Sequence, residues 1–168
     1  IMGKAEASLL HDLPGIEVIV FDKAAGLRAY TSIWKQLRDR RFDALLHMQS
    51  ALRASLLTLG IKANKILGFD QQRAGDGQSL FTNYKVPSPQ SPHVLDGFMA
   101  FAAELGVQDL TPQWHIPITE ADNEWAKQTI SSKKPTLLIA PSASKAYKNW
   151  TKEGYAALAD HAAIQGFD

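Results

Sequence analysis

The chain has 168 residues and a formal net charge of +1, with 45% hydrophobic and 21% charged residues. This composition is typical of a folded protein with one or two cores and excludes a disordered chain. The near-neutral charge argues against a dedicated nucleic-acid binder, and the lack of cysteine removes disulfides, thiolate nucleophiles and cysteine metal ligands.

The apolar runs are short. The longest aliphatic stretches, such as "VIVF" and "LLIA", fall far below the roughly 20 residues that a membrane helix needs. We therefore expect neither a membrane span nor a secretory leader.

Four aliphatic runs predict strands buried on both faces, because their apolar residues do not alternate with polar ones. They lie at residues 16–21, 44–48, 65–69 and 136–140. An apolar stripe between the first two, from Leu27 to Leu37, repeats at helical spacing and predicts an amphipathic helix.

Three further helices are predicted from apolar stripes and from capping residues. The first runs to about Leu105, with Ser91 as the expected N-cap, Pro92 at the first helical position and Gly106 at its end. The second begins at a capping box of Thr119 and Asp122, and the last begins at Thr151. Strands that alternate with helices indicate an α/β fold with a mostly parallel sheet.

A loop rich in serine and lysine, "PSASKAYKNW" at residues 141–150, lies between the last predicted strand and the last helix. Ligands of parallel sheets bind at such strand-to-helix loops, where helix N–H groups attract anions. A phosphate could accept hydrogen bonds from the hydroxyls of Ser142 and Ser144. Its negative charge could pair with the cations Lys145 and Lys148. Neither a Walker loop nor a dinucleotide fingerprint is present, so a plain solvated loop is the alternative interpretation.

This loop resembles the "P-G-A-S-x-x-x-K-R-W-P" motif of family 9 glycosyltransferases, the bacterial ADP-heptose:lipopolysaccharide heptosyltransferases. The matching positions are Pro141, Ala143, Ser144, Lys148 and Trp150. The departures are Ser142 for glycine, Asn149 for arginine and Thr151 for proline. Residues 42–57, "FDALLHMQSALRASLL", are similar to a second family motif, and residues 65–86 and 91–107 resemble its central segments.

The resemblance implies a GT-B architecture, in which two Rossmann-like domains bind acceptor and nucleotide sugar. We expect residues 1–112 to belong to the acceptor-side domain, without its first strand-helix unit. Residues 113–168 are then the linker and the start of the nucleotide-sugar-binding domain. The family's proposed catalytic base, an aspartate near its N-terminus, is expected to lie outside this chain. We therefore expect an internal fragment that is inactive alone.

The resemblance implies inverting transfer of heptose from ADP-heptose to an anionic acceptor of the lipopolysaccharide inner core, in the cytoplasm and without a further cofactor. The expected diphosphate-binding residues are Ser142, Ala143, Ser144 and Lys148. The expected acceptor-binding residues are Gln49, Arg53 and Arg73, although Gly75 stands where the family has a second arginine. Each of these lysines and arginines has an alternative role as an ordinary surface residue.

A basic cluster, defined as Lys35, Arg38, Arg40 and Arg41, suggests either peripheral contact with the anionic inner membrane or a solvated helix face. The histidines are scattered at His11, His47, His93, His115 and His161, and we expect no metal site. A non-catalytic α/β module that binds an anion or a nucleotide remains the alternative function.

Overall fold

In the computed structural model, which describes residues 1–10, 12–130 and 133–168, the chain forms two compact units, Ile1–Pro117 (unit 1) and Ile118–Asp168 (unit 2). The sequence led us to expect a boundary after residue 112. Unit 1 contains helices α1 (Lys4–Leu10), α2 (Leu27–Leu37), α3 (Leu52–Thr58) and α4 (Val94–Glu104), with the 3-10 turns η1 (Lys23–Ala25) and η2 (Gln78–Leu80). Unit 2 contains α5 (Glu120–Thr129), the 3-10 turn η3 (Ala146–Lys148) and α6 (Lys152–Ile164).

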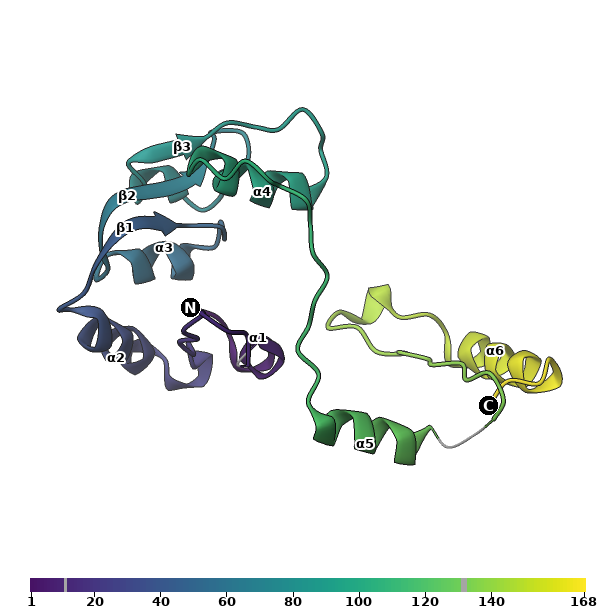
Figure 1. The fold of residues 1–168 in the computed structure, drawn as a ribbon. Helices are drawn as coiled ribbons and strands as arrows, with labels where there is room; N and C mark the ends of the chain where they lie inside the picture. Colours follow the sequence, from purple (N-terminus) through teal and green to yellow (C-terminus); the bar gives the residue numbers. More distant parts are fainter. Residues whose placement is uncertain (11, 131–132) are drawn as a thin grey trace. The chain divides into compact units, whose positions relative to one another are not determined.

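The parallel sheet belongs to unit 1. Among the described residues its strands are β1 (Arg41–Leu46), β2 (Lys62–Phe69) and β3 (Tyr84–Val86), in the order β1-β2-β3 (Figure 1). Leu45 pairs with Ile66, and Phe69 pairs with Val86. The α/β fold and its parallel sheet are therefore confirmed, and the strands at residues 44–48 and 65–69 correspond to β1 and β2.

Two predicted strands are wrong. Residues 16–21 form only an isolated parallel bridge between Val20 and Met2, and Ile16 and Val20 are exposed. Residues 136–140 are assigned no strand, and Leu137 donates its backbone N–H to Asp168. An aliphatic run forms a strand only where a neighbouring strand pairs with it along its length, and neither run has such a neighbour among the described residues.

β3 was not predicted, because three residues with a lysine in the middle carry little hydrophobic pattern. Its last residue, Val86, is nonetheless fully buried. It packs with Leu67 of β2 and Phe101 of α4, and Phe69 meets Phe101 edge to face at 5.1 Å between ring centroids. This cluster attaches α4 to the sheet.

A second core cluster of unit 1 joins α2 to the residue that precedes β2. Its buried members are Ile33, Leu37 and Ile61. The indole N–H of Trp34 donates to the carbonyl of Leu57 at 2.9 Å, which fastens α2 to α3. The helix expected over residues 27–37 is confirmed with these bounds because its apolar stripe is the face that is buried.

The starts of α5 and α6 in unit 2 agree with the sequence, whereas the start of α4 in unit 1 does not. Thr119 and Asp122 form the capping box of α5, and the Thr151 hydroxyl accepts the Gly154 N–H at the start of α6. The predicted N-cap Ser91 is wrong: His93 caps α4 by accepting the Leu95 N–H at 3.2 Å. Ser91 instead accepts the N–H of His93, so the turn extends two residues further before the helix begins.

Candidate functional site

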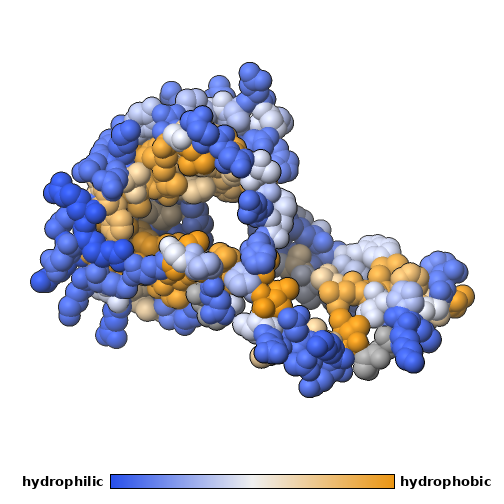
Figure 2. All heavy atoms as spheres, in the orientation of Figure 1, coloured by the Kyte–Doolittle hydropathy of each residue, from blue (hydrophilic) through white to orange (hydrophobic). Residues whose placement is uncertain are grey.

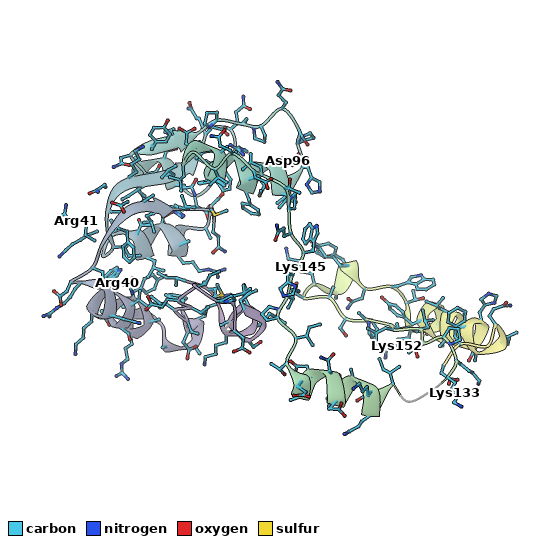
Figure 3. All side chains as sticks on the ribbon, in the orientation of Figure 1. Arg40, Arg41, Asp96, Lys133, Lys145 and Lys152 are labelled. Carbon is cyan, nitrogen blue, oxygen red and sulfur yellow. The ribbon has the colours of Figure 1, made fainter. Side chains whose placement is uncertain are left out.

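The serine- and lysine-rich loop lies in unit 2 between an extended segment and α6. Its residues, 141–150, are all exposed, and the single turn η3 interrupts the loop. Within that turn Lys148 donates its N–H to the Lys145 carbonyl, and Asn149 donates to Ala146, both at 3.0 Å. Lys145 and Lys148 therefore stand at the two ends of one tight turn, and Figure 3 labels the first of them.

The side chain of Asn149 closes this loop. Its Oδ1 accepts the backbone N–H of Ala143 at 2.6 Å, across six residues of sequence. Asparagine commonly bonds nearby backbone in this way, and its short side chain reaches the loop without adding charge. Sequence reasoning recorded Asn149 only as a departure from the family's arginine and missed this bond.

The tryptophan after the loop packs on the start of α6. The Trp150 ring meets Tyr155 edge to face with centroids 5.4 Å apart. A Cβ at Gly154 would lie 2.5 Å from the indole, so only glycine allows the ring this close to the helix. Together with the Thr151 cap, this contact ties the end of the loop to the helix.

Other donors of the loop remain available to a ligand. Within the part of the chain that the structure describes, no acceptor is found for the backbone N–H groups of Ser142, Ser144 and Lys145. The Ser142 and Ser144 hydroxyls are likewise unpaired there, and the Lys145 ammonium lies 5.8 Å from the centroid of the Tyr147 ring. Backbone N–H groups, hydroxyls and cations are the kinds of group that bind phosphate.

Two of the expected acceptor residues, Gln49 and Arg53, come together in unit 1. Gln49 follows β1 and Arg53 lies on α3; both are exposed and both line one cavity of about 520 Å³. His47, Met48 and Leu57 line the same cavity, so its wall is largely apolar. On the face of unit 1 seen in Figure 2, apolar residues gather around a hollow.

The third acceptor candidate, Arg73, lines a different cavity of about 280 Å³ and is engaged in holding loops together. Its Nε donates to Asp70, and its Nη2 donates to the carbonyls of Val86 and Pro87, each at 3.0 Å. The guanidinium also lies over the Phe69 ring at 5.0 Å. Its Nη1 is buried close to Gly97 of α4 and has no hydrogen-bond partner among the residues that the structure describes.

Asp70 completes this cluster. Its Oδ2 accepts the Ser88 hydroxyl at 2.8 Å as well as the Arg73 guanidinium. Burial alone would raise the pKa of Asp70, but hydrogen bonds from Ser88, Arg73 and the Gln72 N–H lower it to about 2. The carboxylate is therefore ionised at neutral pH and balances the charge of Arg73.

A buried polar network beside Gln49 was not predicted. His47 and Ser55, 4% and 0% exposed, share a hydrogen bond of 2.9 Å between Nε2 and Oγ. The fully buried Gln78 donates to the His47 carbonyl at 2.8 Å and accepts the Phe69 N–H at 3.1 Å. Burial lowers the pKa of His47, which keeps the ring neutral at pH 7. The available signal was a histidine at the end of an apolar strand with a serine eight residues on.

The basic cluster is partly neutralised. Arg40 donates to Glu17 at 2.6 Å and lies over the Phe42 ring, and Arg38 pairs with Asp39 at 3.1 Å. Figure 3 labels Arg40 and Arg41 near one edge of unit 1. These pairs leave Lys35 and Arg41 as the cluster's cations without a described ion pair.

The part of the chain that the structure describes has neither a metal-binding cluster nor a helix suited to a membrane. Over residues 1–10, 12–130 and 133–168, no cluster of three histidine, aspartate or glutamate side chains is arranged to hold a metal ion. His11 lies outside the described residues. No helix within those ranges has the length and apolar character to cross a membrane.

Comparison with known proteins decides the family. The model of glycosyltransferase family 9 (heptosyltransferase) matches residues 30–168, which include every candidate site residue named above. The chain belongs to glycosyltransferase family 9.

Two relatives of this family member are informative. The "Lipopolysaccharide core heptosyltransferase OpsX" of Haemophilus influenzae is 49% identical over 160 residues, which are 95% of this chain and 46% of the relative. The crystal structure of a family 9 glycosyl transferase from Veillonella parvula aligns with a TM-score of 0.73 at 18% identity, over 99% of this chain and 50% of that one. The chain therefore spans about half the length of the relatives it matches, and it shares the fold of half of the solved structure.

Proposed function

We propose that the protein to which this chain belongs transfers heptose from ADP-heptose to an acceptor in the lipopolysaccharide inner core. The observation that carries the proposal is the 49% identity to a lipopolysaccharide core heptosyltransferase. The donor, the acceptor and the stereochemical course are our inference. In the same proposal the whole protein has a GT-B architecture, with the acceptor side in residues 1–112 and the donor side beginning in residues 113–168.

The loop at residues 141–150 is proposed to hold the diphosphate of the donor. Lys148 supplies the cation, while the hydroxyls and free N–H groups of Ser142 and Ser144 supply hydrogen bonds. Such groups act mainly in the transition state, because negative charge grows on the diphosphate as it leaves. We propose no cofactor beyond the nucleotide sugar, because these hydrogen-bond donors and cations stabilise the negative charge of the leaving diphosphate.

The transfer itself is proposed to invert the anomeric carbon. A carboxylate takes the proton of an acceptor hydroxyl while that oxygen attacks, and the bond to the diphosphate breaks. We assign no residue of this chain as that base. Inversion follows if attack and departure occur on opposite faces of the sugar in one step.

On the acceptor side, Gln49 and Arg53 are proposed to contact the anionic acceptor, because both line the larger cavity and both are exposed. Arg73 is proposed to contribute less directly, since its contacts hold the ends of β2 and β3 together. A nucleotide-sugar donor suggests that the reaction occurs in the cytoplasm. Peripheral contact of the basic cluster with the inner membrane remains part of the proposal, although two of its arginines are paired.

The test is a transfer assay with the full-length protein, ADP-heptose and a heptose-deficient lipopolysaccharide core. We expect turnover by the full-length protein and none by residues 1–168 alone. If the full-length protein bound ADP but transferred no heptose to any core acceptor, the non-catalytic nucleotide-binding module would replace the proposed function.

A further inference from the structure

Asn149 occupies a distinctive place in the loop of unit 2. Its Oδ1 accepts the N–H of Ala143 at 2.6 Å, and its own backbone N–H donates to Ala146 at 3.0 Å. The residue is thus bonded to both sides of the loop. These two bonds set the distance between the Ser142–Ser144 arm and the η3 turn that ends at Lys148.

The bond to Ala143 also determines which N–H groups a ligand can use. The N–H of Ala143 is already satisfied, whereas those of its neighbours Ser142 and Ser144 have no acceptor among the residues the structure describes. The bond to Ala143 restrains the backbone on either side of it. Ala143 then serves as an anchor of the loop, and the N–H groups of the two serines are left for a ligand.

Asn149 is itself held from the helix side. The next residue, Trp150, packs against Gly154 and Tyr155, and Thr151 caps α6. Asn149 therefore links a loop whose residues are all exposed to a helix with a defined start. A loop that is shaped before its ligand arrives loses less conformational freedom on binding.

We propose that Asn149 is a positioning residue that preorganises this loop for the diphosphate of a nucleotide sugar. The inference rests on the proposed function and deepens it. A neutral amide suits the role, because an aspartate would accept the same N–H but would place a negative charge beside the anion.

The experiment uses full-length protein labelled with ¹⁵N-alanine, in which solvent exchange of the Ala143 amide is measured by NMR without ligand. ADP affinity is measured on the same samples by calorimetry. The variants are Asn149→Ala, which removes the acceptor, and Asn149→Asp, which keeps it. The matched control is Asn123→Ala on the exposed side of α5, far along the sequence from the loop.

We expect Asn149→Ala to speed Ala143 exchange roughly fivefold and to weaken ADP binding by a similar factor, the effect of one lost hydrogen bond. Asn149→Asp should keep the slow exchange and still bind ADP more weakly, and Asn123→Ala should change neither quantity. Unchanged exchange or unchanged ADP affinity in Asn149→Ala would overturn the inference. Failure of the wild-type protein to bind ADP would instead overturn the proposed function, and the inference with it.

Discussion

The two compact units of this chain differ in how their elements are stabilised. Every buried residue that the structure describes lies in unit 1, from Ala7 to Phe101, and none of the described residues of unit 2 is buried. Unit 2 nevertheless contains two well-formed helices, each with a threonine N-cap. Helix caps and turn hydrogen bonds thus stabilise the elements of unit 2, whereas buried side-chain packing stabilises those of unit 1.

Patterns that act over a few residues predict this structure more reliably than patterns that need a distant partner. A cap or a helical stripe acts within a few residues, so α2, α5 and α6 begin where their sequences indicate. A strand depends on a partner distant in sequence. Residues 136–140 are more aliphatic than β1, but among the described residues their backbone bonds only to Asp168, so they form no assigned strand.

Two aromatic residues, one from each unit, should differ strongly in their contribution to stability. Phe101→Ala should lower the free energy of unfolding by about 3–5 kcal/mol, because the ring is fully buried against Leu67 and Val86. Trp125→Ala in α5, whose side chain is 67% exposed, should change it by less than about 1 kcal/mol. Urea denaturation of both variants measures this. Equal decreases in the free energy of unfolding would contradict the contrast between a unit with a buried core and one whose described residues are not buried.

The next effect concerns the arginine that joins the loops of unit 1. Arg73→Lys should lower the free energy of unfolding by about 2 kcal/mol, because lysine cannot donate at once to Asp70, Val86 and Pro87. The matched control is Arg53→Lys, an exposed arginine on α3 with no described ion pair. Urea midpoints compare the two. A larger loss in the control would show that Arg73 is an ordinary surface arginine.

A smaller effect depends on pH and arises from His47. Its folded pKa is below the ordinary 6.5, so the unfolded state binds a proton first as the pH falls. The free energy of unfolding should therefore be at its full value above about pH 7. It should decline below pH 6.5, by at most about 1.4 kcal/mol per pH unit. Denaturation from pH 7.5 to 5.5 should show a shallower decline for His47→Gln than for wild type. A slope in His47→Gln equal to that of the wild type would contradict this prediction.

The smallest effect tests the capping of unit 2. Thr151→Ala should lower the free energy of opening the first turn of α6 by about 1 kcal/mol, because the Gly154 N–H loses its acceptor. Hydrogen exchange should then accelerate in the first turn of α6 and stay unchanged in β2 and α4. Thr151→Ser should restore the wild-type exchange. Acceleration spread over unit 1 would mean that the two units do not behave separately.

The sequence predicted the fold class, the strands β1 and β2 and the exposed loop, because each rests on local periodicity or on turn chemistry. It did not predict β3, whose burial of Val86 depends on Phe101 fifteen positions further on. At the candidate site it indicated Lys148 and the two serines by residue type. It did not reveal the bonds of Asn149 and Arg73, since both follow from how loops close in space.

We propose that the loop at residues 141–150 holds the diphosphate of a heptose donor. The decisive measurement is the kcat/KM for ADP-heptose of full-length Lys148→Ala, with Lys133→Ala as the control for a lysine outside the loop. Loss of a positioned cation predicts a decrease of roughly a hundredfold, about 3 kcal/mol of barrier, in Lys148→Ala alone. A wild-type value in Lys148→Ala, or an equal decrease in both variants, would contradict the account.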